Sequence, residues 1–349
     1  MSITSHLPRY PLAFLPTPLH PLPRLSEQLA IYFELPADGF QLWIKRDDQT
    51  GLATGGNKTR KLEFLVADAL AQGADTFLTV GAAQSNHCRQ AAAAALQAGL
   101  ECHVILTGPP PAEINGNLLL DQLLGAHIHW APREERLARM AALAEELRGA
   151  GRHPYTTTFG GSDPVGACGY VLAMEELFGQ VTAMGLKLDA IITASSSSGT
   201  QAGLVVGAWV LGWDVPILGI SIDETQANLQ AKVADLATRT ASYLGHPHTF
   251  APEDIWVNAD YLGAGYGIMG ELEREAIYTL ARTEGVLLDP VYTGRAFGGL
   301  LDLIRHQAQA LPQPTRAEMN YLFWHTGGVA ALFAYADQLP GSPLDQSLP

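Results

Sequence analysis

Short apolar runs of strand-like composition alternate with longer helical patterns along most of this 349-residue chain. This order constrains the fold, because alternating strands and helices predict a mostly parallel sheet with helices on both faces. In such folds the loops after the carboxyl ends of the strands carry the site. The strands that we predict are residues 41–45, 76–80, 103–106, 128–130, 190–193, 217–222 and 321–325.

Three of these strands end in polar or glycine-rich turns that lead into a helix. The turns are residues 81–87 (GAAQSNH), 194–200 (ASSSSGT) and 326–328 (TGG). Residues 84–87 (QSNH) present amide and hydroxyl groups that suit a carboxylate or the phenolic oxygen of a pyridine ring. An ordinary polar turn, with Asn86 capping the helix, is the alternative interpretation.

Lys58 lies where residues 55–57, two glycines and an asparagine, turn the chain into an amphipathic helix. A cation in the first turn faces the positive end of the helix dipole at a cost of about 0.3–1 kcal/mol. Arg60 and Lys61 add like charge, so we expect the pKa of Lys58 to be lowered. A partly neutral amine can form a Schiff base with a carbonyl, which is the attachment that pyridoxal phosphate requires. A solvated basic helix start is the alternative.

The segment from Ser196 to Thr200 places several hydroxyl groups and Gly199 at a helix N-terminus. Successive backbone N–H groups there can cradle a dianionic phosphate. A single serine or threonine would suffice as a helix cap, and four consecutive serines exceed that need. This segment matches no glycine pattern of the nucleotide-binding type, so it favours a phosphate smaller than a mononucleotide.

Tyr266 and Tyr292 lie in loops rich in glycine and proline, which bring backbone and phenol close to a ligand. Taken alone, a tyrosine in such a loop is more often a surface or half-buried residue than a ligand contact. His325 ends an apolar strand and is interpreted as a core histidine. No spacing typical of metal ligands and no Ser-His-Asp order is present, so no metal is predicted.

The formal net charge of −14 and the pI near 5.1 exclude some partners. Such a field repels nucleic acid and anionic membrane surfaces, so neither is predicted. Three widely separated cysteines argue against a disulfide framework and favour a cytoplasmic location. Prolines interrupt the first 23 residues, which we expect to form an extended arm with no signal peptide. No apolar run approaches the ~18 residues of a membrane span.

Five motifs, in order along the chain, resemble the 1-aminocyclopropane-1-carboxylate deaminase and D-cysteine desulfhydrase family. They are residues 55–63 (GGNKTRKLE), 84–86 (QSN), 198–203 (SGTQAG), 289–292 (DPVY) and 325–328 (HTGG). The resemblance runs from about residue 15 to residue 335. It implies the two-domain α/β fold of tryptophan synthase β, fold type II, with mostly parallel twisted sheets and helices on both faces.

The resemblance also implies how the chain is organised. Residues 1–53 with 163–349 would form a large cofactor-binding domain and residues 54–162 a small domain. Pyridoxal 5'-phosphate would lie in the cleft between them, and the enzyme would be a homodimer.

The family's functional residues carry over to matching positions of this sequence. Lys58 would hold the aldehyde of the cofactor, and Lys61, on the same helix face, would reach its phosphate. Asn86 would contact the ring hydroxyl. The catalytic residues implied are Lys58, Ser85 beside the substrate carboxylate, and Tyr266 and Tyr292 near the substrate side chain. The cofactor-binding residues implied are Asn57, Lys58, Lys61, Asn86, Ser196, Ser197, Ser198, Gly199, Thr200, Thr293 and Thr326.

Thr293 and Thr326 distinguish the branches of this family. Deaminases that open a cyclopropane ring typically carry a glutamate and a leucine at these positions. A carboxylate beside the pyridine nitrogen keeps it protonated, which ring opening needs and a hydroxyl does not ensure. The threonine pair resembles the D-cysteine desulfhydrases.

The resemblance implies a carbon–sulfur lyase that acts on a small amino acid, D-cysteine, and forms pyruvate, hydrogen sulfide and ammonia. The alternatives are an L-cysteate sulfo-lyase, a 1-aminocyclopropane-1-carboxylate deaminase and, in another class, a non-catalytic amino-acid-binding protein. Substrate chirality and the leaving group are not settled by the sequence.

Overall fold

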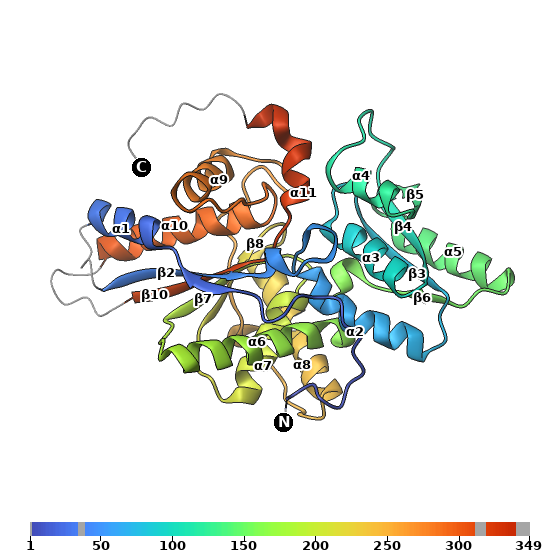
Figure 1. Ribbon diagram of the computed structural model, residues 1–349, viewed down its shortest axis with the longest axis horizontal. Coiled ribbons are helices and arrows are strands. Elements are labelled where there is room, and N and C mark those ends of the chain that lie inside the picture. Colours follow the sequence, from blue (N-terminus) through green and yellow to red (C-terminus); the bar gives the residue numbers. More distant parts are fainter. Residues whose placement is uncertain (1, 34–38, 311–318, 340–349) are drawn as a thin grey trace.

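The computed structural model describes residues 2–33, 39–310 and 319–339 and contains two sheets that lie side by side (Figure 1). The larger sheet has the strand order β1-β2-β10-β7-β8-β9. Strand β1 runs antiparallel to β2, and the other neighbours are parallel. Its strands are β1 (Leu19–Pro21), β2 (Phe40–Arg46), β7 (Ala190–Ser195), β8 (Ile217–Ser221), β9 (Trp256–Asn258) and β10 (Met319–His325).

The smaller sheet has four parallel strands in the order β5-β4-β3-β6. They are β3 (Thr76–Ala82), β4 (Glu101–Thr107), β5 (His127–Ala131) and β6 (Pro154–Thr156). All seven predicted strands are present, and the parallel α/β class is confirmed. All four strands of this sheet lie within residues 54–162, while the proposed domain boundaries themselves stay a prediction.

Both faces of the larger sheet are buried, which explains why its strands are apolar almost without interruption. Ile44, Ile192 and Phe323 pack toward one helical layer, and their neighbours Ile191 and Trp324 pack toward the other. The first layer comprises α1 (Pro23–Tyr32), α9 (Glu271–Glu284) and α10 (Thr293–Ala310). The second comprises α6 (Pro164–Met184), α7 (Gly199–Leu211) and α8 (Gln226–Tyr243).

The smaller sheet is also covered on both faces. Phe77 and Val104 pack toward α2, α3 and α4, whereas Leu78 and Ile105 pack toward α5. The sheet is therefore a second three-layer unit with its own core. These helices are α2 (Lys58–Ala71), α3 (Asn86–Gln97), α4 (Gly116–Leu123) and α5 (Arg136–Gly149), and a short helix, α11 (Val329–Leu332), follows β10.

The N-terminal arm lies along α2 and is hydrogen-bonded to it. The Tyr10 N–H donates to the Glu63 carbonyl at 2.8 Å, and the Leu12 and Ala13 N–H groups donate to the Glu63 carboxylate at 2.9 Å. The extended arm predicted for the first 23 residues ends before Pro23, because Pro23 is the first residue of α1. Proline is accepted at the first helical position, where no N–H is required.

The three cysteines, Cys88, Cys102 and Cys168, are free thiols and all are buried. Within residues 2–33, 39–310 and 319–339, no helix has the length and apolar character needed to cross a membrane.

Candidate active site

A cavity of about 590 Å³ lies between the two sheets. Its walls include the loops that follow β3 and β7 and the segments that lead into α2 and α10. The predicted site residues that line it are Asn57, Lys58, Ser85, Asn86, Ser196, Ser197, Ser198, Thr200, Tyr266, Tyr292 and Thr326. The other three, Lys61, Gly199 and Thr293, each neighbour a lining residue along the chain or by hydrogen bonding.

Lys58 is the first residue of α2 and faces the cavity. The preceding turn requires glycine, because Gly55 and Gly56 have φ of 72° and 126°. A Cβ atom on Gly55 would also lie 2.1 Å from the Asp48 carbonyl oxygen. Burial lowers the pKa of Lys58 to about 8, and a hydrogen bond with Lys61 opposes this shift. The predicted direction is therefore confirmed, but burial is its main cause.

Arg60 points away from Lys58 into a buried charge network that anchors the start of α2. Its guanidinium donates to Asp47 at 2.8 and 2.9 Å and to Glu176 at 2.9 and 3.1 Å. Asp47 also accepts hydrogen bonds from Tyr170 at 2.6 Å and Trp324 at 2.9 Å. Burial alone would raise the pKa of Asp47, but Arg60 holds it below its usual value. The predicted effect of Arg60 on Lys58 is thus wrong, since these carboxylates neutralise its charge.

Lys61 connects α2 to the loop at residues 158–162 and to the start of α7. Its ammonium group donates to the Gly160 carbonyl and to Ser162 Oγ, both at 3.2 Å. The Ser162 hydroxyl donates to Ser197 Oγ at 2.9 Å and accepts from the Gly199 N–H at 3.3 Å. Burial lowers the pKa of Lys61 well below its ordinary value, and Lys58 adds to this effect. Amine, hydroxyl and backbone donors therefore gather at one corner of the cavity.

The two glycines of this corner, Gly160 and Gly199, have no room for a side chain of their own. A Cβ on Gly160 would lie 2.6 Å from Ser197 Oγ, and a Cβ on Gly199 would lie 2.7 Å from Lys61 Nζ. Helix α7 begins here, and the N-terminus of a helix attracts anions through its N–H groups and dipole. The corner is thus a compact cradle of donors that fits a phosphate group.

The N-terminus of α3 forms another part of the wall. Ser85 caps this helix by accepting a hydrogen bond from the Cys88 N–H at 3.2 Å, so the cap is not Asn86. The side-chain oxygen of Asn86 accepts from Asn117 Nδ2 at 2.9 Å. That bond orients the amide, and its nitrogen lies 2.9 Å from the position that a Cβ on Gly328 would take. The helix start and the oriented amide offer donors to a carboxylate or a ring oxygen.

The two predicted tyrosines meet in the cavity wall. Their hydroxyl oxygens lie 2.7 Å apart, and their rings pack edge to face. Burial raises the pKa of Tyr266, and both burial and Tyr266 raise the pKa of Tyr292 well above its usual value. Both phenols are therefore neutral near pH 7 and can donate a proton.

The two threonines of the branch prediction occupy different environments. Thr326 lines the cavity, and its carbonyl accepts from the Asn57 N–H at 2.9 Å. Thr293 is fully buried, and its hydroxyl donates to the Asp289 carboxylate at 2.7 Å while accepting from the Asp289 N–H. The hydroxyl hydrogen of Thr293 is thus committed to a carboxylate at the start of α10.

Several lining residues were not predicted, because no motif marks them. Ser162 and Gly160 come from a loop without a recognisable pattern, and Asp223 follows β8 and accepts a hydrogen bond from Ser196. His87 is the last residue of the predicted turn at residues 81–87, and both of its ring nitrogens are buried without a hydrogen-bond partner among the residues that the structure describes. Burial lowers the pKa of His87 well below its usual value, so this imidazole is neutral.

His325 does not enter the cavity wall. Its Nε2 contacts the Leu287 carbonyl at 3.0 Å, and its Nδ1 accepts from the Gly327 N–H at 3.1 Å. The residue is 1% exposed, so its interpretation as a core histidine is confirmed.

The fold and this donor set define the class of protein as a pyridoxal-phosphate-dependent enzyme. The cofactor's aldehyde fits the amine of Lys58, and its phosphate fits the cradle around Lys61 and the start of α7. Its ring oxygen fits the oriented amide of Asn86. The site thus offers a partner for the aldehyde, the phosphate and the ring oxygen of the cofactor.

Sequence comparison gives the family. The family model described as "Pyridoxal-phosphate dependent enzyme" matches residues 11–326, and the chain belongs to this family. The chain is 43% identical over 339 residues to the D-cysteine desulfhydrases of Salmonella paratyphi B and Salmonella typhi, with 95% of this chain and 98% of each relative covered. The predicted family and cofactor are confirmed.

Solved structures agree with the fold. A crystal structure described as an ACC deaminase homologue has a TM-score of 0.84 at 36% identity and covers 97% of each chain. An O-ureido-L-serine synthase has a TM-score of 0.65 at 17% identity, with 94% of each chain covered, which is a likeness of fold alone. The predicted fold type II architecture is confirmed.

Proposed function

We propose that this enzyme is a D-cysteine desulfhydrase, which converts D-cysteine and water to pyruvate, hydrogen sulfide and ammonia. The observation that carries the proposal is that a lysine amine of pKa about 8 and a pair of neutral phenols line one cavity. An α,β-elimination needs a base at Cα and an acid at the leaving group. The nearly full-length relation to the Salmonella desulfhydrases supports the same reaction.

When bound, pyridoxal phosphate supplies an electron sink that makes the Cα proton of an amino acid acidic. In our proposal Lys58 attaches the cofactor and, once displaced by the substrate amine, removes that proton. Its pKa of about 8 suits both tasks, because a useful fraction of the amine is neutral near pH 7. Lys61, Ser162, Ser197 and the start of α7 hold the phosphate.

The substrate carboxylate is assigned to the N-terminus of α3. Ser85 and Asn86 line the cavity there, and the 12-residue helix directs its first N–H groups toward this end. A carboxylate at this position would lie on the side of the small sheet, while the phosphate lies at the start of α7. The substrate would therefore be held between the two three-layer units.

Tyr292 and Tyr266 are assigned to the leaving group. Because the two hydroxyls share one hydrogen bond, one phenol can donate to the departing sulfur while the other stabilises the resulting charge. A thiolate leaves readily, so a modest electron sink suffices. Thr293 fits this requirement, because its hydroxyl hydrogen is directed to Asp289 and the position carries no carboxylate of its own.

The runner-up reactions use the same cavity. The similarity to a solved ACC deaminase homologue makes ring opening of the cyclopropane acid one alternative reaction. The other alternative substrate, L-cysteate, has a sulfonate where cysteine has a thiol. Arg133, Arg136 and Lys232 line the cavity mouth of a chain with net charge −14, so local positive charge is available for an anionic substrate. Thr293 and Thr326 favour the desulfhydrase branch.

The deciding experiment gives the purified enzyme D-cysteine, L-cysteine, L-cysteate and the cyclopropane acid separately. Pyruvate with sulfide from D-cysteine is the expected result. Sulfite from L-cysteate, or 2-oxobutanoate from the cyclopropane acid, at a higher kcat/KM would overturn the substrate assignment while leaving the cofactor chemistry intact.

We further propose that the enzyme works in the cytoplasm as a homodimer with the domain division given above. Three free, buried thiols suit a reducing compartment. The dimer rests on the family resemblance, and size-exclusion chromatography with light scattering tests it.

A further inference from the structure

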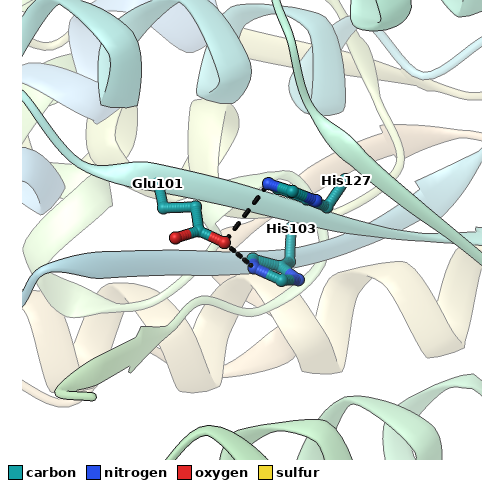
Figure 2. A group of neighbouring side chains, drawn as sticks. All are labelled: Glu101, His103 and His127. Atoms are coloured by element: carbon teal, nitrogen blue, oxygen red, sulfur yellow. Dashed lines mark hydrogen bonds and ion pairs between the residues drawn. The ribbon is translucent and has the colours of Figure 1, made fainter.

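Glu101, His103 and His127 lie together on the smaller sheet (Figure 2). With His129 they form a cluster of one carboxylate and three imidazoles on the face that packs against α5. Glu101 and His103 are two residues apart on β4, so their side chains point to the same face. His127 is the direct cross-strand neighbour of His103, and His129 follows on the same face of β5. None of these four residues lines the active-site cavity.

The cluster is far from the reaction along the strand direction. Thr107, at the carboxyl end of β4, lines the cavity, whereas Glu101 begins the same strand. Thr107 is six residue steps from Glu101 along the strand, which is about 20 Å at ~3.3 Å per residue. Whatever this cluster binds is therefore not the substrate in the catalytic cavity.

The distances between Glu101, His103 and His127 suit the binding of one ion by all three side chains. Glu101 Oε1 lies 2.9 Å from His103 Nε2 and 3.2 Å from His127 Nε2. One ligand atom from each of the three residues lies within 4.8 Å of the others. Tetrahedral zinc, with bonds of about 2.0–2.2 Å, separates its ligand atoms by roughly 3.3–3.5 Å. Small side-chain rotations would bring these three atoms to that spacing.

We propose that Glu101, His103 and His127 form a binding site for one divalent transition-metal ion of the zinc class. Two imidazole nitrogens and one carboxylate oxygen form a donor set that zinc prefers. Three protein ligands leave one position for water or another small ligand. Within the described ranges of the chain, no other trio of histidine, cysteine or acidic side chains meets the same spacing.

The surrounding residues orient these ligands. His103 Nδ1 lies 3.0 Å from His129 Nε2, so His129 can accept the Nδ1–H bond when Nε2 binds a metal. Such an outer hydrogen bond fixes the tautomer of a ligating histidine. Arg152 occupies the other oxygen of Glu101 at 2.7 Å, which leaves Oε1 as the single carboxylate ligand.

One ligand has to turn for metal to bind. The rings of His103 and His127 stack with an angle of 17° between their planes, and nitrogen lone pairs of parallel rings do not converge. The His103 side chain is 8% exposed and fixed by His129, whereas the His127 side chain is 55% exposed. A rotation of His127 therefore closes the site at little energetic expense.

Equilibrium dialysis of the untagged holoenzyme against Zn²⁺, without thiols or substrate, tests the proposal. Wild type should bind one Zn²⁺ per chain. Glu101→Gln and His127→Ala should each weaken that binding by at least ~10-fold, the loss that even an outer-shell change produces. His246→Ala, which removes an exposed histidine outside the cluster, should leave it unchanged. His127 is exposed enough that its truncation leaves the fold intact, which the bound cofactor's absorbance verifies.

Each other outcome overturns the site. Absence of stoichiometric zinc in wild type would show that Glu101 serves only as a hydrogen-bond acceptor for the histidines and Arg152. Zinc binding that survives in both cluster variants would place the metal elsewhere. A second measurement uses Co²⁺, whose intense visible absorption in a tetrahedral nitrogen and oxygen site should appear in wild type and be lost in His127→Ala.

Discussion

The hydroxyl oxygens of Tyr266 and Tyr292 lie 2.7 Å apart, although 26 residues separate them in the chain. Tyr266 belongs to the glycine-rich loop at residues 263–267, and Tyr292 directly precedes α10. Both phenols have a pKa raised above the ordinary tyrosine value, so both are protonated near pH 7. In our proposal this pair is a proton source for the leaving group that is separate from Lys58.

Replacement of Tyr292 by Phe should therefore reduce kcat for D-cysteine by about 10²–10⁴-fold, the usual contribution of a general acid. Elimination from 3-chloro-D-alanine should fall much less, because chloride leaves without a proton. The ratio of the two rates is the readout, measured as pyruvate formed. Tyr243→Phe, at a half-exposed tyrosine outside the cavity, serves as the control. An equal loss of kcat on both substrates would show that Tyr292 binds the substrate or supports the structure of the site and is not the acid.

Lys58→Ala should abolish covalent attachment of the cofactor and lower turnover by at least ~10²-fold, since one residue is nucleophile and base in our proposal. Borohydride reduction followed by mass spectrometry of the protein detects the attachment. Lys187→Ala removes an exposed lysine and should retain both properties. Turnover at the wild-type rate in Lys58→Ala would contradict the assigned chemistry.

The rate at which cofactor-stripped enzyme attaches pyridoxal phosphate should rise with pH and level off above about 8. Only the neutral amine of Lys58 attacks the aldehyde, and burial lowers its pKa to about 8. Stopped-flow absorbance at constant ionic strength measures the rate. A rate that continues to rise toward the ordinary lysine value of 10.5 would show that Lys58 is not perturbed in solution.

Gly160→Ala should weaken cofactor binding by about 1–3 kcal/mol, the range for overpacking a filled site, or ~5- to 150-fold. Its Cβ would lie 2.6 Å from Ser197 Oγ and 3.1 Å from Lys58 Nζ. Gly151→Ala is a matched control, because Gly151 also has positive φ but open space around its Cβ position. Titration with pyridoxal phosphate should therefore give a weaker affinity for Gly160→Ala than for Gly151→Ala. Equal affinities would show that the cradle does not hold the cofactor's phosphate.

Asp47→Ala should destabilise the protein by about 3–5 kcal/mol, because it leaves Arg60 buried with a partner missing. Urea unfolding measures this, with Asp235→Ala, an exposed ion-pair partner, as the control. The pKa of Asp47 is lowered in the folded protein, so its contribution is complete above its unfolded value of 3.8. The free energy of unfolding of wild type should fall as the pH drops below 3.8. The free energy of unfolding of Asp47→Ala should fall less over the same pH range.

The sequence predicted the central strands well and the edges poorly. Strands such as β7 and β10 are buried on both faces, so they are apolar enough to recognise. The unpredicted strands β1, β6 and β9 have three residues each and lie at sheet edges. A three-residue edge strand has no periodicity, and its pairing depends on the tertiary fold.

The site was predictable where a local motif marks it. Lys58 stood out at a glycine-rich helix start and Tyr292 in a proline-containing loop. Ser162 lies in a loop without such a motif, and Asp223, although it follows β8, carries no pattern that distinguishes it from an ordinary strand end. The pKa of Lys58 was predicted in direction, but its cause required the structure, because burial and the pairing of Arg60 are not visible in a linear sequence.

The zinc-class cluster shows the same limitation. A search along one segment finds no metal spacing, yet Glu-x-His on β4 and His-x-His on β5 alternate onto one face of neighbouring strands. The pairing register that joins them is a property of the sheet. Matching alternate residues between predicted adjacent strands would have detected it.

Lys61 is buried and Lys58 is half-buried in the cavity wall, and neither forms an ion pair within the part of the chain that the structure describes. In our proposal pyridoxal phosphate binds Lys58 through its aldehyde and the Lys61 cradle through its phosphate, and only the native chain offers both sites. Binding would therefore shift the folding equilibrium by ~2.7 kcal/mol when the free cofactor concentration is 100 times its Kd. The abundance of this enzyme in a cell is then tied to its vitamin B6 supply. Scarcity would reduce the activity per molecule and also expose more of the chain to proteolysis.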